Sequence, residues 1–369
     1  MNKLDELIAE FCPDGVEFAK LGDCCAIEDN KRKPIKASER TTGKTPYYGA
    51  NNIQDYVDGF THDGEYVSIA EDGSSSLDNY SIQCVSGKFW ANNHVHVVKG
   101  NEELNSRFLY HFLTTFNFVP YLVGGTRAKL NRASMIKIRI PLPPLPVQNE
   151  IVRILDNFTE LTAELTAELT ARKKQYEYYR KELLTFTDDV KKVPLIDVVK
   201  IKRGVRVVKS QLAVEGEYPV FQNSMTPLGY MDKANCTGDT AFIITAGAAG
   251  EIGYTDNDFW AADDCFSFEC PQYLKSKYLY YILLCQKNTI YSKVRKASIP
   301  RLPRSAIEKL IIPVPNVDIQ EKIVDVLDRF DTLCNDISKG LPAEIEARQK
   351  QYEYYRDKLL TFKESSDEN

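Results

Sequence analysis

The sequence predicts an α/β protein with two mixed α/β domains, each followed by a long helix, in a pseudo-twofold internal repeat. Three observations support this fold class. The twelve residues Gln175–Phe186 recur at Gln351–Phe362 with only two changes. The thirty residues Lys129–Phe158 match Arg301–Phe330 at a constant offset of 172. Between these motifs, short β-branched runs alternate with glycine, asparagine and aspartate turns, which is typical of strands.

The repeat divides the chain into four segments. We predict a first globular domain at 1–147, a central long helix at 148–189, a second globular domain at 190–317 and a C-terminal helical region at 318–369. Each globular segment ends in a strand that runs into prolines, which would stop the strand and turn the chain into the helix. The N-terminal residues echo the end of the repeated helix, so the pattern is circular and predicts termini that meet.

The helical segments carry the spacing of a coiled coil. Ile151–Phe186 lacks glycine and proline and places seam residues at alternating intervals of three and four. In the second copy this seam is interrupted at Ser338–Ile345, where Gly340 and Pro342 predict a break between two helices.

The repeated motif divides its tyrosines between two faces. Four of them fall on the seam, where aromatic side chains usually pack between helices: Tyr176, Tyr179, Tyr352 and Tyr355. Tyr178 and Tyr354 fall off the seam in both copies. We therefore predict that these two form a surface that a partner covers.

Composition limits the class of protein. No stretch approaches the roughly 18 apolar residues of a membrane helix, and the N-terminus lacks the cationic start and apolar core of a signal peptide. None of the nine cysteines forms a C-x-x-C pair, which is typical of reduced thiols. We expect a cytoplasmic protein without membrane contact. The net charge of −5 excludes a uniformly basic coat but not local basic faces.

Catalytic motifs are absent from the sequence. There is no G-x-x-x-x-G-K-[ST] phosphate loop, no Asn/Asp-Pro-Pro-Tyr motif of an adenine methyltransferase and no G-x-S-x-G elbow. His94 and His96 lie on one face of a probable strand, but a metal site would need a third ligand that the sequence does not place. Glu17 and Lys20 could suggest a nuclease, but they are wrongly spaced for the usual carboxylate-x-lysine pair. We expect a chain that is not an enzyme and holds no metal.

Basic residues cluster at equivalent places in the two copies, beside glycine-rich and asparagine-rich loops. One such run is usually a solvated face, but its recurrence favours contact with DNA phosphates. The first copy supplies Lys31, Arg32, Lys33, Arg127, Lys129 and Arg132. The second copy supplies Lys202, Arg203, Arg206, Lys209, Lys293, Arg295, Lys296, Arg301 and Arg304. Polar side chains of the neighbouring loops, which differ between the copies, would read base edges.

Together these residues resemble the specificity subunits of type I restriction-modification systems. The resemblance covers nearly the whole chain. It is strongest in IPLPPLPVQNEIVRILD, in KKQYEYYRKELLTF and in their second copies. Three loop motifs support it: Glu71–Gly73, Asn92–His94 and Gly125–Arg132. The resemblance adds Glu71, Asp72, Asn92, Asn93 and His94 to the candidate DNA contacts. The second copy departs from the family pattern by lacking the Asn-Asn-His residues, so the resemblance does not imply a shared base contact at that position, although it still implies the fold.

The resemblance implies two target-recognition domains separated by an antiparallel coiled coil of two long helices. Such a subunit would read a bipartite, asymmetric target on double-stranded DNA. It would dock two methyltransferase (modification) subunits and, in the full complex, two restriction subunits. S-adenosylmethionine, ATP and Mg would be bound by these partners, so no cofactor is expected in this chain. The competing hypothesis is a coiled-coil adaptor that binds only proteins, and a third is a self-sufficient nuclease, which would need a carboxylate cluster that the sequence lacks.

The first long helix also carries TAELTAELTA at Thr162–Ala171, a four-residue repeat. Four residues lengthen a helix by about 6 Å and turn it by roughly 40°. One base pair advances DNA by about 3.4 Å and turns it by roughly 35°. We interpret the repeat as a ruler for the unread gap between two half-sites. A replication-slippage repeat without consequence is the alternative.

Overall fold

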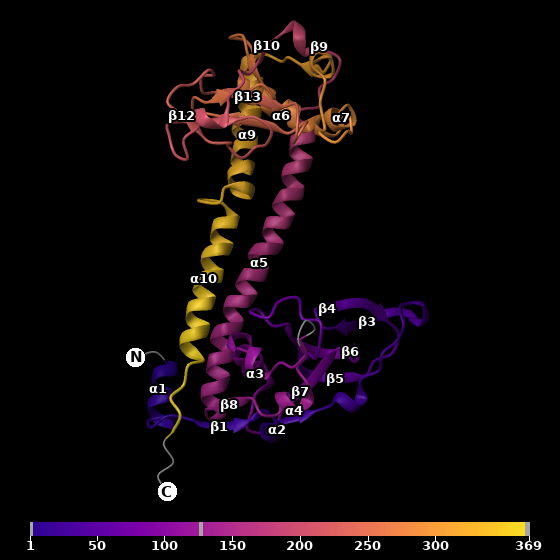
Figure 1. The fold of residues 1–369 in the computed structure, drawn as a ribbon, viewed down its shortest axis with the longest axis vertical. Coiled ribbons are helices and arrows are strands. Elements are labelled where there is room, and N and C mark those ends of the chain that lie inside the picture. Colours follow the sequence, from indigo (N-terminus) through magenta and orange to yellow (C-terminus); the bar gives the residue numbers. More distant parts are fainter. Residues whose placement is uncertain (1–2, 125–127, 366–369) are drawn as a thin grey trace. The chain divides into compact units, whose positions relative to one another are not determined.

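The computed structural model describes residues 3–124 and 128–365. The chain forms two compact units. Unit 1 comprises Met1–Glu164 and Ile345–Asn369, and unit 2 comprises Leu165–Glu344. Each unit combines β-sheets with helices (Figure 1), so the predicted mixed α/β class and its twofold repeat are confirmed.

Unit 1 contains a six-stranded sheet with the order β2-β7-β5-β6-β3-β4. Neighbouring strands are antiparallel except β3 and β6, which are parallel. Helix α3 (Ser106–Thr115) packs on the sheet because Phe108 and Leu109 share a buried core with Ile69 and Val98. The strands are β2 (Cys25–Ile27), β3 (Thr42–Gly49), β4 (Asn52–Val57), β5 (His62–Ala70), β6 (Ile82–Ala91) and β7 (Val95–Gly100).

Unit 2 repeats this strand order in two pieces, β10-β16-β13-β14 and β12-β11-β15. β14 pairs with β13 as β6 pairs with β5, and β15 pairs with β11 as β6 pairs with β3. The single strand β6 is therefore replaced by two short ones. The strands are β10 (Lys200–Arg203), β11 (Tyr218–Phe221), β12 (Tyr230–Met231), β13 (Thr240–Ile244), β14 (Ile252–Thr255), β15 (Trp260–Ala261) and β16 (Cys265–Glu269), and the covering helix is α6 (Ser276–Cys285).

Shorter elements connect these layers. Two-stranded ladders join β1 (Glu17–Lys20) to β8 (Arg139–Leu142) and β9 (Lys192–Pro194) to β17 (Ile311–Pro313). The short α-helices are α1 (Lys3–Phe11), α2 (Leu21–Cys24), α4 (Arg132–Met135), α7 (Lys287–Ser292) and α8 (Arg304–Glu308). The 3-10 helices are η1 (Asp29–Lys31), η2 (Ala37–Glu39), η3 (Val119–Tyr121), η4 (Leu195–Asp197) and η5 (Lys209–Gln211).

Three long helices follow the domains: α5 (Leu145–Leu183), α9 (Val317–Asn335) and α10 (Leu341–Leu359). The predicted break at Gly340 is confirmed, since α9 and α10 are separate helices. The prediction that the helical seam reaches Phe186 and Phe362 is wrong. Both phenylalanines lie beyond the helix ends, because the chain turns there and packs these side chains against the cores of the domains.

Each copy of the tyrosine motif packs inside one unit. In unit 1, Tyr355 of α10 stacks on Phe158 of α5, with ring centroids 5.4 Å apart. In unit 2, Tyr176 and Tyr179 of α5 stack on Phe330 of α9 at 6.1 and 5.6 Å. In both pairs the two helices run in opposite directions (Figure 1).

The circular arrangement of the repeat is confirmed in unit 1, where the two ends of the chain meet. The Val16 N–H donates to the Lys363 carbonyl at 2.9 Å, and the Ser365 N–H donates to the Val16 carbonyl at 2.9 Å. Arg139 of β8 forms an ion pair with Glu364 beside these bonds. The C-terminal helix thus leads into the first domain as α5 leads into the second.

A buried glutamine holds the junction between each domain and its long helix. The Gln148 side chain accepts from the Asn105 N–H at 2.8 Å and donates to the carbonyls of Glu103 and Pro143 at 2.7 and 2.6 Å. Gln320 makes the equivalent three bonds in unit 2, at 2.9, 2.9 and 2.8 Å. Both side chains are fully buried. This clamp explains why glutamine recurs after the proline-rich strand exit.

No helix in the part of the chain that the structure describes is long and apolar enough to cross a membrane.

We predict that Gln148→Leu lowers the free energy of unfolding of unit 1 by about 3 kcal/mol, because it leaves three backbone groups, one buried and two partly buried, without their side-chain partner. Gln320→Leu should have the same effect on unit 2. Urea denaturation combined with amide hydrogen exchange would assign each loss to its unit. The control is Gln351→Leu on an exposed face of α10, which should cost less than about 0.5 kcal/mol. Equal losses in all three variants would contradict the clamp.

Candidate nucleic-acid interface

In unit 1, three loops meet at a backbone frame centred on Glu71. The Glu71 N–H donates to the His94 carbonyl at 2.8 Å, and the Glu71 carbonyl accepts from the Leu130 N–H at 2.8 Å. Lys129 exchanges two backbone hydrogen bonds with Val123, at 2.8 and 2.9 Å. These bonds bring the loop after β5, the β6–β7 turn and the basic loop before α4 together.

Unit 2 has the same frame, centred on Thr245. The Thr245 N–H donates to the Asp264 carbonyl at 2.7 Å, and the Thr245 carbonyl accepts from the Leu302 N–H at 2.8 Å. Arg301 exchanges two backbone hydrogen bonds with Arg295, at 2.8 and 3.1 Å. The backbone therefore presents equivalent positions in the same way in both units.

The first basic run of each copy, 30–33 in unit 1 and 200–209 in unit 2, is held by an equivalent tryptophan hydrogen bond. The Trp90 Nε1–H donates to the Lys33 carbonyl at 2.6 Å, and the Trp260 Nε1–H donates to the Val205 carbonyl at 3.0 Å. The repeated Phe-Trp-Ala sequence thus anchors these runs beside the frame.

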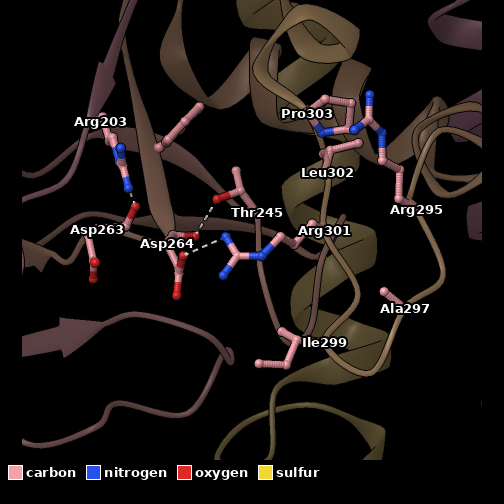
Figure 2. Close-up of a pocket in the computed structure, with 11 residues that line it drawn as sticks. Arg203, Thr245, Asp263, Asp264, Arg295, Ala297, Ile299, Arg301, Leu302 and Pro303 are labelled. Atoms are coloured by element: carbon pink, nitrogen blue, oxygen red, sulfur yellow. Dashed lines mark hydrogen bonds and ion pairs between the residues drawn. The ribbon is translucent and has the colours of Figure 1, made fainter.

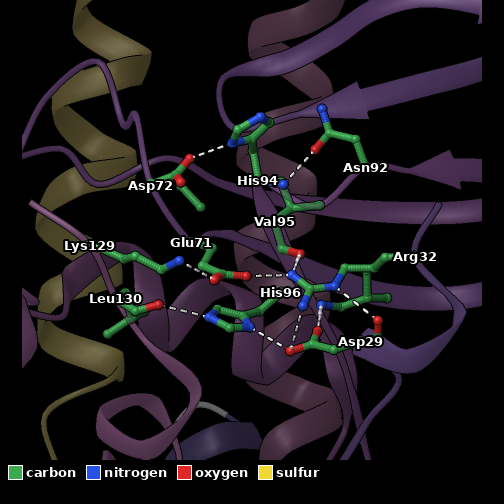
Figure 3. A network of polar contacts seen from close by, with 12 residues as sticks. Asp29, Arg32, Glu71, Asp72, Asn92, His94, Val95, His96, Lys129 and Leu130 are labelled. Carbon is green, nitrogen blue, oxygen red and sulfur yellow. Dashed lines mark hydrogen bonds and ion pairs between the residues drawn. The ribbon is translucent and has the colours of Figure 1, made fainter. Parts of the chain in front are cut away.

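Five side chains form an ion network under the frame of unit 1 (Figure 3). Arg32 Nη1 lies 2.6 Å from Glu71 Oε2, and Lys129 Nζ lies 2.7 Å from Glu71 Oε1. Asp29 contacts Arg32 at 3.5 Å and His96 Nδ1 at 2.6 Å. Burial alone would raise the pKa of Glu71, but the hydrogen bonds from Lys129 and Arg32 lower it overall. The ionised Glu71 carboxylate is therefore paired with both cations, Arg32 and Lys129.

Above this network lies an exposed rim. His94 Nδ1 and Asp72 Oδ1 are 2.6 Å apart, and both side chains are partly exposed, as is Asn93. Asn92 is only 3% exposed, and its Oδ1 accepts from the His94 N–H at 2.8 Å. Asn92 therefore holds the turn that carries the exposed rim, and its contact with DNA stays a prediction.

The two histidines of this region face different surroundings. His96 is buried, and its Nε2 lies 2.8 Å from the Leu130 carbonyl, whereas His94 is at the surface. Across residues 3–124 and 128–365, no group of three or more His, Cys, Asp or Glu side chains could hold a metal ion.

In unit 2 the corresponding side chains line a cleft of about 380 Å³ (Figure 2). Arg301 Nη1 lies 4.0 Å from Asp264 Oδ1. The Arg203 Nε–H donates to the Asp263 carbonyl at 3.1 Å, which fixes this arginine at the wall of the cleft. The Thr245 hydroxyl donates to the Asp264 carbonyl at 2.9 Å. The cleft thus contains both guanidinium donors and carboxylate acceptors.

The remaining predicted contacts vary in how far they are already paired. Lys31 pairs with Glu28 at 2.8 Å, Lys202 pairs with Glu269, and Arg304 pairs with Glu308 at 2.8 Å. Arg127 lies outside the described residues. The other basic candidates are exposed: Lys33, Arg132, Arg206, Lys209, Lys293, Arg295 and Lys296.

The two tyrosines predicted to meet a partner are exposed in both copies. Tyr178 is 61% exposed and Tyr354 is 63% exposed. Each forms an edge-to-face contact with the next tyrosine, Tyr179 or Tyr355, at 5.5 and 5.3 Å. The two motifs therefore present the same aromatic pair.

Sequence reasoning missed four residues of the candidate interface: Asp29, Thr245, Asp263 and Asp264. The signal for three of them was available, because Thr245 aligns with Glu71, and Asp263 and Asp264 align with Asn93 and His94. Asp29 carried no such signal, since its partner His96 is distant in the sequence and buried.

A family model described as "Type I restriction modification DNA specificity domain" matches residues 13–172 and 187–347. The chain belongs to this family of specificity subunits. A Haemophilus influenzae protein that bears the name of a type I restriction enzyme specificity subunit is 45% identical, over 94% of this chain and 96% of its own length. A type I restriction enzyme specificity subunit from Escherichia coli is 33% identical, over 98% of this chain and 97% of its own.

Solved structures support the fold. The S subunit of a type I restriction-modification system from M. genitalium superposes with a TM-score of 0.71 at 16% identity, covering 94% of this chain and 96% of that one. A chain from a structural study of complex assembly and conformational transition of the type I R-M system gives 0.57 at 17% identity, covering 94% and 98%. The predicted family is thus confirmed, and the two units contain its DNA specificity domains.

We predict that Glu71→Gln lowers the free energy of unfolding by about 2 kcal/mol, because Arg32 loses its closest carboxylate in a partly buried site. The adjacent Asp72→Asn is the control. It breaks an exposed pair and should cost less than about 1 kcal/mol. Urea denaturation of both variants at neutral pH would measure this difference.

The contribution of Glu71 to the free energy of unfolding should decrease at acidic pH. Because the folded-state pKa of Glu71 is lowered, its contribution is present above the ordinary glutamate value of about 4.3 and is lost as the pH falls through the folded-state pKa. The gap between wild type and Glu71→Gln should therefore shrink below about pH 4. A gap that stays constant would contradict this account.

Proposed function

We propose that this specificity subunit reads a bipartite, asymmetric site on double-stranded DNA, one half with each unit, and that it is the non-catalytic member of its complex. The observation that carries the proposal is that the two units share the same backbone hydrogen-bond frame but place different side chains on it. Glu71 is replaced by Thr245, and His94 by Asp264. Equal frames would present their loops in the same way, whereas different donors and acceptors select different base edges.

We propose further that two methyltransferase subunits dock on the long helices. The tyrosine motif occurs in both copies of the repeat, so the exposed Tyr178 and Tyr354 would offer the same contact to each methyltransferase subunit. Two restriction subunits would complete the full complex. S-adenosylmethionine, ATP and Mg would then be bound by the partner subunits.

The alternative is an adaptor that binds only protein partners through its helices. The recurrence of exposed basic side chains beside both frames favours DNA. Binding of the chain together with its methyltransferase to specific and unrelated duplexes, at two salt concentrations, separates the two proposals. An adaptor would show neither sequence preference nor salt dependence.

The first prediction from this function is that the units are independent readers. Replacing residues 1–147 by the equivalent region of another specificity subunit should change one half of the methylated sequence and leave the other half intact. Sequencing of methylated sites in cells with the wild-type or the exchanged subunit would measure this. A change in both halves would show that the units read DNA jointly.

The second prediction concerns docking. Changing both Tyr178 and Tyr354 to Ala should leave the chain folded, because both side chains are exposed, and should reduce co-purification with the methyltransferase. The matched control replaces Tyr56 and Tyr273, one exposed tyrosine in each unit, and should leave assembly intact. Loss of the folded state in the first variant, or equal assembly by both variants, would contradict the assignment.

A further inference from the structure

The residue at the centre of each frame determines whether the neighbouring basic side chain has a carboxylate to pair with. In unit 1 the Glu71 carboxylate contacts both Arg32 and Lys129. In unit 2 the same position is Thr245, which carries no charge and whose hydroxyl donates to a backbone carbonyl. Arg301, the equivalent of Lys129, therefore has no carboxylate at the centre of its frame.

Arg301 is directed into the cleft of unit 2 together with Asp264 (Figure 2). Its side chain is 64% exposed, and the 4.0 Å between Arg301 Nη1 and Asp264 Oδ1 is too long for a hydrogen bond. The donors of the guanidinium and the acceptors of the carboxylate thus remain available to a third group.

A phosphate is a poor match for this cleft. Asp263 and Asp264 line it together with Arg203, Arg295 and Arg301, so carboxylate acceptors lie beside guanidinium donors. A phosphate has only acceptor oxygens, so it could pair with the arginines but would leave the Asp264 carboxylate without a donor. The major-groove edge of a G·C pair is a better match. Its guanine offers two acceptors, O6 and N7, to the arginine fork, and its cytosine offers the N4 amino group to a carboxylate.

We propose that Arg301 and Asp264 together read one G·C base pair in the half-site of unit 2. Arg301 donates to guanine O6 and N7, and Asp264 accepts from cytosine N4. This inference rests on the proposed function. It also changes the role expected for Arg301 from the sequence, from phosphate contact to base reading.

Three variants test the proposal in the complex with the methyltransferase. Arg301→Lys keeps the charge but removes the bidentate fork, which a base contact needs and a phosphate contact does not. Asp264→Asn keeps the shape but adds a donor. Thr245→Glu installs the central carboxylate of unit 1 next to Arg301. Each variant should lose preference at the same single position of the second half-site, and the first half-site should be unchanged.

The measurements are methylated-site sequencing and binding to duplexes that differ at one base pair, each at two salt concentrations. We expect cognate binding to weaken by about 10- to 100-fold, with unchanged affinity for unrelated DNA and an unchanged salt slope. Arg304→Ala provides the comparison. If Arg304 contacts a phosphate, this variant weakens all sequences alike and lowers the slope by about one unit.

Two outcomes would overturn the inference while leaving the proposed function intact. Arg301→Lys could keep the wild-type preference, while Arg301→Ala weakens all sequences alike with a lower salt slope, as a phosphate contact requires. Alternatively, the three variants could change different positions. A wild-type complex without any sequence preference would overturn the proposed function itself. Melting temperatures of the three variants would confirm that each chain is folded.

Discussion

Carboxylates of the long helices hold each unit at the junction of its domain and its helices, one in unit 1 and two in unit 2. In unit 1, Asp156 of α5 contacts Arg107 Nε at 2.8 Å and His111 Nε2 at 2.9 Å, both from α3. The other ring nitrogen of His111 lies 3.3 Å from the Tyr352 hydroxyl of α10. Burial alone would raise the pKa of Asp156, but the hydrogen bonds from Arg107 and His111 lower it overall, so the carboxylate stays charged. Domain, long helix and tyrosine motif therefore share one polar junction.

Unit 2 builds the same junction from different side chains. Asp328 of α9 pairs with Lys277 at 3.1 Å and accepts from the Tyr281 hydroxyl, while Tyr176 lies 3.5 Å from Asp331. The tyrosine motif is therefore needed twice for closure of the units, before any partner is considered. Its inward tyrosines complete the two units, and its outward ones remain available for docking. A single repeated sequence can satisfy both requirements because one set of tyrosines lies on the seam and the other lies off it.

The sequence predicted the features that depend on local spacing. The seam, the helix break at Gly340 and the equivalence of the two domains all follow from periodicity and repetition. Features that depend on tertiary contacts were not predictable. Glu71 could have faced DNA, but it meets Arg32 and Lys129, which are 39 and 58 residues away in the chain. The burial of Asn92 was not predictable either, because a polar side chain in a loop gives no sign of it.

The repeat Thr162–Ala171 shows why one part of this chain can vary in length. It lies within α5, and between Leu155 and Tyr176 no side chain of that helix is buried. Leu155 belongs to the core of unit 1 and Tyr176 to the core of unit 2, so each half of the helix is anchored in its own unit. Four added residues would lengthen the helix by about 6 Å without displacing a buried side chain. Both frames would keep their hydrogen bonds, so a change in spacing need not alter what either unit reads. This independence is what a ruler between two half-sites would require.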